Sequence, residues 1–168
     1  MDITQNKITT LFNEIAPTYD RANRIMSLGM DRAWRRRACE KALSLGATQE
    51  AMKILDVACG TGDMMAAWEK AARARDLTLT LAGADIAQEM TAIAGRRFPH
   101  HRVVTAAAGQ LPFDDASQHI VSCAFGVRNI VARSEALREF FRVLRPGGVL
   151  LILEFMKPEG GAVMGHFR

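Results

Sequence analysis

The sequence predicts an α/β fold, a doubly wound and mostly parallel sheet with helices on both of its faces. Short apolar runs recur along the chain, amphipathic stretches separate them, and a glycine-rich turn follows the first run directly. Such alternation is typical of parallel strands joined by crossover helices. The predicted strands are 52–58, 79–85, 102–107, 119–125 and 148–155, and the helices between them are 63–75, 88–97 and 134–144.

Two helical segments precede the predicted sheet. Residues 7–16 have apolar side chains at helical spacing and end before Pro17, which disfavours helix in the residue ahead of it. Residues 21–45 are predicted to be helical with a break near Ser27 to Gly29, and Asp31 is expected to cap the second part. We therefore divide the chain into an N-terminal helical segment, 1–50, and a sheet domain, 51–168.

The composition is that of an ordinary globular protein. The 168 residues are 49% hydrophobic and 24% charged, which suits one domain with its own core. No apolar run approaches the roughly 18 residues of a membrane span, and the N-terminus has no secretory signal. The three cysteines are odd in number and widely spaced, which favours reduced thiols. We expect a cytoplasmic protein.

The net charge of +4 is mild, but residues 32–41 contain four arginines. One interpretation is a solvated helix face. The other is a surface that meets anionic lipid or a phosphate-bearing ligand, with contact at the inner face of the membrane. Nucleic acid is not expected as a partner, because the sequence lacks a recognition motif and any interleaving of basic with aromatic residues.

The turn after the first predicted strand suggests a ligand site. Gly60 and Gly62 permit positive φ and a close approach to backbone, and the helix that begins near Asp63 presents free N–H groups. Asp85 ends the next strand, where a carboxylate can accept hydrogen bonds from both hydroxyls of a ribose. A turn made only for packing and a nicotinamide dinucleotide site are the alternatives. The third glycine of a dinucleotide fingerprint is absent, so a nucleoside ligand without a diphosphate fits better.

Longer motifs indicate a family. The segments "LDVACGTGD", "GADIAQEM", "LPFDDAS", "AFGVRN" and "EFFRVLRPGGVLLILEFMKP", with "FNEIAPTYDRANRIMSLGMDRAWRRR" ahead of them, span most of the chain. The sequence resembles class I S-adenosylmethionine-dependent methyltransferases, and more narrowly the UbiE/MenG C-methyltransferases of ubiquinone and menaquinone biosynthesis. The resemblance implies a Rossmann-like fold with an N-terminal helical lid, S-adenosylmethionine as cofactor with S-adenosylhomocysteine as product, and a small apolar aromatic or prenylated quinol as acceptor.

The resemblance also assigns site residues. It places the turn against the methionine part of the cofactor, Asp85 on the ribose and Ile86 beside the adenine, and it includes Tyr19 and Asn23 in the lid. The cofactor-binding set is then Tyr19, Ala58, Gly60, Thr61, Asp85, Ile86, Ala107 and Ala108, and the substrate-binding set is Asn23, Phe125 and Arg128. A lid of this kind excludes water and holds the methyl group in line with the attacking carbon.

Arg128 and Asn129 follow the fourth strand and are the predicted catalytic residues. In the chemistry that the family implies, ionising a ring hydroxyl makes the adjacent ring carbon nucleophilic. A guanidinium can stabilise the phenolate and an amide can orient it. Arginine is a poor base, so Arg128 is assigned electrostatic stabilisation. The alternative for Arg128 is an ordinary surface ion pair.

Other reactive residues carry no prediction of chemistry. His100 and His101 have no carboxylate or cysteine at ligand spacing, so no metal site is predicted. Cys59 has no paired base for nucleophilic work.

The sequence departs from the family pattern in three places. Ala107 and Ala108 stand where the family has a polar residue for the adenine amine, a loss of about 0.5–1.5 kcal/mol. His119 replaces an acidic residue. The family continues beyond strand 148–155, whose edge would otherwise be open, so we expect a truncated form, a partner chain or strand exchange in a homodimer.

Three functions of different classes follow. The first is a methyltransferase acting on a quinol precursor or another apolar aromatic acceptor. The second is a binding or regulatory subunit that retains the cofactor fold without turnover. The third is an inactive structural remnant.

Overall fold

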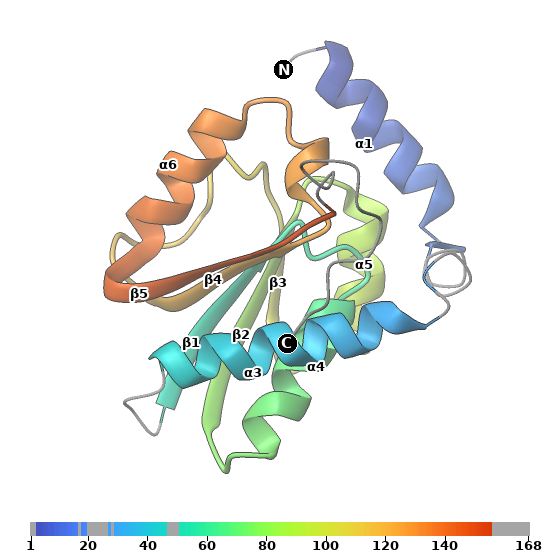
Figure 1. The fold of residues 1–168 in the computed structure, drawn as a ribbon. Helices are drawn as coiled ribbons and strands as arrows, with labels where there is room; N and C mark the ends of the chain where they lie inside the picture. The colour runs from blue at the N-terminus through green and yellow to red at the C-terminus, as the bar shows by residue number, and fades with distance from the viewer. Residues whose placement is uncertain (1–2, 17, 20–26, 28, 47–50, 156–168) are drawn as a thin grey trace, which may run out of the picture.

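The computed structural model describes residues 3–16, 18–19, 27, 29–46 and 51–155, and Figure 1 shows their arrangement. Five strands form one parallel sheet in the order β3-β2-β1-β4-β5. The strands are β1 (Ala51–Val57), β2 (Thr78–Asp85), β3 (Arg102–Thr105), β4 (Gln118–Ala124) and β5 (Leu144–Leu153). The strand order reverses between β1 and β4, and in such sheets ligands bind beyond the carboxyl ends at that point.

Helices cover both faces of the sheet, as predicted. They are α1 (Ile3–Ile15), α3 (Met30–Gly46), α4 (Asp63–Arg73), α5 (Gln88–Arg97) and α6 (Arg133–Val143), with a 3₁₀ turn, η1 (Val127–Asn129), after β4. Neighbouring residues of β1 belong to different cores: Ile54 packs with α3 and α4, whereas Leu55 packs with α6. Because successive side chains of a strand point to opposite faces, each face buries its own apolar cluster.

A buried chain of hydrogen bonds links α4 to the two central strands. The indole Nε1 of Trp68 donates to Ser122 Oγ at 2.9 Å, and Ser122 Oγ donates to Asp56 Oδ1 at 2.7 Å. All three residues are at most 1% exposed. Burial is the main cause that raises the pKa of Asp56, to about 7, against the hydrogen bond from Ser122. These hydrogen bonds lie beneath the carboxyl ends of β1 and β4.

Several predicted boundaries were wrong. α1 begins at Ile3 rather than at residue 7, β3 ends at Thr105 rather than 107, and β5 begins at Leu144 rather than 148. Asp31 is not the cap of α3, because the helix already begins at Met30 and Asp31 lies in its first turn. Asp31 instead accepts a hydrogen bond from Ser27 Oγ at 2.9 Å, on Oδ1.

β5 is an edge strand within the described part of the chain, as predicted. It pairs with β4 on one side, and its apolar side chains Leu150 and Ile152 are 39% and 43% exposed. Leu137 and Phe141 of α6 are also exposed, at 43% and 81%. An uncovered apolar edge of this kind favours pairing with another segment.

Candidate functional site

A pocket of about 550 Å³ lies at the carboxyl ends of β1, β2 and β4. That volume is within the range of small-molecule sites, roughly 300–1,000 Å³. Its lining includes Gln5, Phe12, Tyr19, Val57, Ala58, Gly60, Asp85, Ile86, Met90, Ala106, Ala107, Ala108, Gly109, Gln110, Phe125, Gly126, Asn129, Ile130, Val131 and Glu135. The pocket therefore occupies the place that the strand order favours for a ligand.

The turn after β1 forms the floor of the pocket. Three of its residues have positive φ: Ala58 at 54°, Gly60 at 55° and Gly62 at 94°. A Cβ on Gly60 would meet no other atom within 4 Å, so the backbone there is open to a ligand. α4 begins at Asp63, which directs its free N–H groups toward the turn. The turn therefore has the open backbone that the predicted approach of a ligand requires, and that approach stays a prediction.

Asp85 is fixed beside this turn by backbone donors. Its Oδ2 accepts from Gly60 N–H and its Oδ1 from Ala87 N–H, both at 2.9 Å. Burial raises the pKa of Asp85, and the backbone donors of Ala87, Gly60 and Ile86 oppose that rise. A carboxylate has about four acceptor positions, so after the hydrogen bonds from Gly60 and Ala87 at most two remain for ligand hydroxyls.

Ala107 and Ala108 line the wall after β3, where the family pattern has a polar side chain. Gln110, an exposed residue, also lines this wall, and its backbone N–H donates to Ala107 O at 3.0 Å. Gln110 can thus offer the polar contact that the alanines cannot. Sequence reasoning missed it because a polar residue in a loop has no distinguishing pattern.

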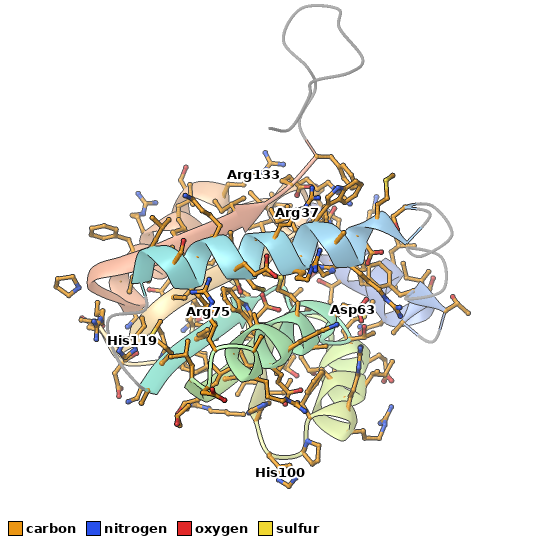
Figure 2. The ribbon with its side chains drawn as sticks, turned by 60° about the horizontal axis from the view of Figure 1, so that its bottom comes forward. Arg37, Asp63, Arg75, His100, His119 and Arg133 are labelled. Atoms are coloured by element: carbon orange, nitrogen blue, oxygen red, sulfur yellow. The ribbon has the colours of Figure 1, made fainter. Side chains whose placement is uncertain are left out.

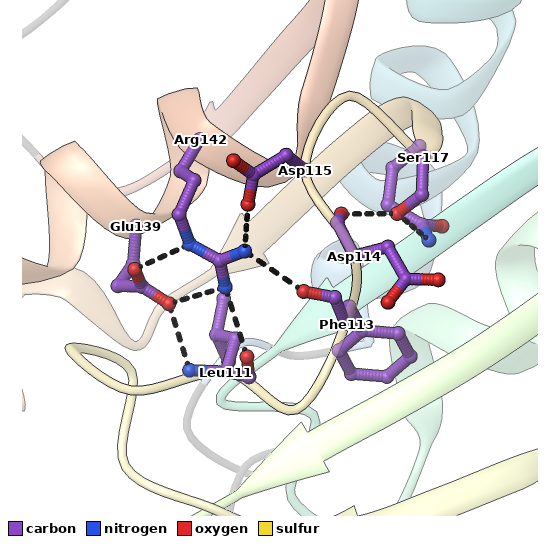
Figure 3. Close-up of polar contacts among 8 residues, drawn as sticks. Leu111, Phe113, Asp114, Asp115, Ser117, Glu139 and Arg142 are labelled. Carbon is purple, nitrogen blue, oxygen red and sulfur yellow. Dashed lines mark hydrogen bonds and ion pairs between the residues drawn. The ribbon is translucent and has the colours of Figure 1, made fainter.

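Arg142 of α6 fastens the loop that follows this wall (Figure 3). Its guanidinium donates to the carbonyls of Leu111 and Phe113 at 3.0 and 2.9 Å and pairs with Glu139 and Asp115. Glu139 Oε2 in turn accepts from Leu111 N–H at 2.9 Å, and the hydrogen bond from Arg142 lowers the pKa of Glu139. The loop is therefore held by a fork of charged hydrogen bonds.

The opposite wall follows β4. Phe125 lines the pocket with φ of 58°, and its N–H donates to Leu153 O at 2.7 Å. A Cβ on Gly126 would lie 2.5 Å from Ala58 Cβ, so only glycine allows this wall to reach the floor. Asn129 ends η1 and also lines the pocket.

Arg128 is not among the lining residues. Its Nη1 lies 2.6 Å from Glu154 Oε1, and its side chain is 48% exposed. The guanidinium also lies over the ring of Phe155, with 5.5 Å from Cζ to the ring centroid. Of the two predicted catalytic residues, Asn129 therefore lines the pocket, whereas Arg128 lies outside the lining in an ion pair with Glu154.

α1 lies over the pocket and is attached at both ends. Gln5 Oε1 accepts from Val131 N–H at 3.1 Å, and Asn13 Oδ1 accepts from Glu89 N–H at 3.0 Å. Phe12, between these points, and Tyr19, which follows the helix, both line the pocket and meet edge to face with ring centroids 5.8 Å apart. Sequence reasoning missed Gln5 and Asn13, because both partners are remote in the chain.

Most of the residues predicted to bind the cofactor come together in this pocket. Tyr19, Ala58, Gly60, Asp85, Ile86, Ala107 and Ala108 line it, as does Phe125 of the substrate set. Thr61 does not: its residue is 3% exposed, and its carbonyl accepts from Arg97. Asn23 lies outside the described residues.

Arg35 fits neither prediction for the arginine cluster, namely a solvated helix face or a surface for anionic lipid or phosphate. It is only 7% exposed, and its guanidinium lies 4.9 Å from the centroid of Phe125. It is therefore part of the interior beside the pocket, whereas Arg36 and Arg37 are exposed. Phe125 also stacks on Phe155 at 4.9 Å.

The described residues contain neither a metal-binding cluster nor a membrane-spanning helix. No group of three or more histidine, cysteine or acidic side chains is placed to hold a metal ion. None of the helices there has the length and apolar character needed to cross a membrane.

Comparisons with known proteins agree with the geometry. The ubiE/COQ5 methyltransferase family matches residues 1–167. The ubiquinone/menaquinone biosynthesis C-methyltransferase UbiE of Campylobacter jejuni is 44% identical over 98% of this chain and 70% of its own length. The demethylmenaquinone methyltransferase of Chlorobaculum tepidum is 42% identical over 96% of this chain and 64% of its own length.

Solved structures show the same fold. One is a methyltransferase of Methanococcus maripaludis, described as S-adenosylmethionine-dependent, with a TM-score of 0.63 and 17% identity over 90% of this chain and 64% of its own. The methyltransferase CalH, solved with S-adenosylhomocysteine, has a TM-score of 0.59 and 18% identity over 74% of this chain and 39% of its own.

Proposed function

The chain belongs to the ubiE/COQ5 methyltransferase family, and on that basis we propose that its pocket binds S-adenosylmethionine for C-methylation of a quinol ring in quinone biosynthesis. The observation that carries the proposal is Asp85, held by two backbone donors at the open floor of the pocket. The reduced ring of a demethylmenaquinol or of a ubiquinone precursor is the proposed acceptor.

The residues present fit the cofactor. Asp85 retains acceptor positions for both ribose hydroxyls, and Gly60 leaves the backbone open to the methionine part. The apolar side of Ile86 suits the adenine ring. We propose that Gln110 supplies the hydrogen bond to the adenine amine that Ala107 and Ala108 cannot make.

S-adenosylmethionine would supply an electrophilic methyl group to the ring carbon. The bond from sulfur to that methyl group would break to release S-adenosylhomocysteine, and the ring hydrogen would leave as a proton to solvent. Asn129, in the wall, is proposed to orient the ring oxygen by hydrogen bonding. Arg128 would stabilise that oxygen as it becomes anionic. To do so its guanidinium must leave Glu154, and an exposed ion pair of this kind is worth only about 0–1 kcal/mol.

Within the predicted segment 1–50, α1 is proposed to act as a lid over the sheet domain 51–168, whereas α3 packs into the core of that domain. α1 has hydrogen bonds at both ends, and Ala16, which directly follows it, packs with Ala87 and Met90 at the start of α5. Release of these bonds would open the pocket, and their closure would exclude water from the methyl group.

Two further contacts belong to this proposal. The apolar edge of β5 is proposed to be covered in a homodimer or by a partner chain. A prenylated acceptor partitions into lipid, so we propose that methyl transfer takes place in the cytoplasm at the inner face of the membrane.

The test is transfer of a labelled methyl group from S-adenosylmethionine to a short-chain demethylmenaquinol kept reduced. The proposal predicts label in the ring with the reduced acceptor and none with the oxidised quinone, whose carbons are not nucleophilic. A folded chain that binds the cofactor but labels neither acceptor would contradict the proposed reaction while leaving the cofactor site intact.

A further inference from the structure

A second cavity lies apart from the pocket, between α3 and α4. Its volume is about 450 Å³, and its lining is Asp31, Arg32, Ala33, Arg35, Arg36, Asp63, Ala66, Ala67, Lys70 and Arg97. We call it the α3–α4 groove. Figure 2 shows the two helices that form it, with Asp63 labelled at the start of α4. No residue of the groove lines the larger pocket.

The groove has an excess of positive charge. Five cationic side chains and two carboxylates line it, which leaves three more positive than negative charges. The carboxylate of Asp63 is already paired with Arg97, with Nη1 2.9 Å from Oδ1. Arg32, Arg36 and Lys70 are exposed, and Arg36 makes a long ion pair with Glu40, whose Oε1 is 3.9 Å from Nε. An exposed pair of this kind is weak, so a ligand from solvent can compete for Arg36.

Arg35 provides a buried donor at the base of the groove. Its side chain is 9% exposed, and its Nε makes no hydrogen bond to any of the described residues. The nearest carboxylate oxygen, Asp31 Oδ2, is 3.7 Å away and is itself buried without a hydrogen-bond partner there. Arg35 and Asp31 thus form a long ion pair without a hydrogen bond between these two atoms. A buried N–H left without a hydrogen bond is costly, and a bound group that supplies an acceptor relieves that cost.

The chemistry of the groove matches a phosphate group. Arginine donors in a fixed fork recognise phosphate oxygens, while a lysine adds a mobile point charge. An unsatisfied acceptor beside an unsatisfied donor favours a ligand with a hydroxyl next to its anionic oxygens, because the hydroxyl can donate to Asp31. Protonated inorganic phosphate and the phosphoglycerol headgroup of a lipid both have this combination.

We propose that the α3–α4 groove is a binding site for a phosphate group that carries a neighbouring hydroxyl, with Arg35 at its base and Arg32, Arg36 and Lys70 around its mouth. The groove shares no lining residue with the cofactor pocket, although Arg35 at its base also lies over Phe125 of the pocket wall. It also divides the arginine cluster, since Arg36 lines the groove whereas Arg37, the next residue, does not.

The test uses a double variant and a charge-matched control in the full chain. Arg36→Gln with Lys70→Gln removes two charges from the groove. Arg37→Gln with Lys41→Gln removes two exposed charges of α3 that do not line it. Binding of inorganic phosphate is measured by calorimetry, and binding to phosphatidylglycerol vesicles by co-sedimentation, with phosphatidylcholine vesicles as the uncharged surface.

The proposal predicts that the groove variant weakens binding about tenfold or more, while the control stays within about twofold of the unaltered chain. Loss in the phosphate titration assigns the site to a free phosphate, and loss with phosphatidylglycerol alone assigns it to a lipid headgroup. Absence of binding to both probes, or equal loss in both variants, would overturn the site. Thermal unfolding and S-adenosylhomocysteine binding of each variant identify any variant that is misfolded. If the groove variant is misfolded, Arg36→Lys with Lys70→Arg replaces it as the test. This variant retains both charges, so the proposal predicts that it still binds the probe, and loss of binding by a folded form of it would overturn the site.

Discussion

The two walls of the pocket are held in different ways. The floor and the wall near β2 are fixed by backbone hydrogen bonds to one carboxylate, Asp85, and by a turn with positive φ at Ala58 and Gly60. The wall after β4 has one backbone hydrogen bond, from Phe125 N–H to Leu153 O, and side-chain contacts at the margin. There Arg128 pairs with Glu154, and Phe125 stacks on Phe155, which is 61% exposed.

This difference indicates how the two walls are expected to work. A carboxylate held by backbone is preorganised, so little is lost when a ligand binds to it. An exposed ion pair and an exposed ring rearrange at low cost, which suits a wall that admits a bulky acceptor. We expect the cofactor side to determine affinity and the acceptor side to determine turnover.

The largest effect is expected at Asp85. Asp85→Ala removes both ribose acceptors and should weaken S-adenosylhomocysteine binding by at least about 100-fold, because each hydrogen bond to a charged group is worth about 1.5–3 kcal/mol. Calorimetric titration measures it. Asp114→Ala, which removes an exposed carboxylate outside the pocket, should bind as the unaltered chain does. Comparable affinity in both variants would remove Asp85 from the site.

Arg128 tests the other wall. Arg128→Ala should lower the rate of methyl transfer by about 100-fold, the scale of losing one group that stabilises a developing oxyanion, with S-adenosylhomocysteine binding nearly unchanged. Steady-state kinetics with a reduced acceptor measure the rate. Arg138→Ala, on the exposed face of α6, serves as the control for charge. An unchanged rate in Arg128→Ala would return this residue to an ordinary surface ion pair.

The buried hydrogen bonds that join Trp68, Ser122 and Asp56 lie beneath both walls, and they predict that stability depends on pH. Burial raises the pKa of Asp56 from 3.8 to about 7, so the folded state retains a proton that the unfolded state has lost between those values. Its contribution to the free energy of unfolding should fall by about 1.4 kcal/mol per pH unit as the pH rises from 5 to 6. Urea unfolding of the unaltered chain and of Asp56→Asn measures the difference. Equal pH slopes in the two proteins would place the pKa of Asp56 in its ordinary range.

The smallest effect is expected at the attachments of α1. Gln5→Ala and Asn13→Ala each remove one hydrogen bond, worth about 0.5–1.5 kcal/mol, and should weaken S-adenosylhomocysteine binding by about two- to tenfold. Asn6→Ala, an exposed neighbour that does not line the pocket, is the matched control. Equilibrium titration of the three variants compares them, and equal affinities would mean that α1 does not close on the cofactor.

The sequence carries the local parts of this arrangement. Spacing within a few residues predicts the five strands, the turn at Gly60 and the carboxylate after β2, because their geometry depends on neighbouring residues. It does not reveal the pairing of Arg128 with Glu154, the burial of Arg35 beside Phe125, or the attachments at Gln5 and Asn13. These contacts join residues that folding alone brings together. Bulges and early strand starts, as in β5, depend in the same way on the neighbouring strand.

The most direct test of the account is a calorimetric titration of the chain with S-adenosylhomocysteine. We predict saturable binding of one ligand per chain, with the affinity retained in Arg128→Ala and lost in Asp85→Ala. Absence of binding by a chain that unfolds cooperatively, or equal dependence on the two residues, would contradict the division of the pocket into a cofactor wall and an acceptor wall.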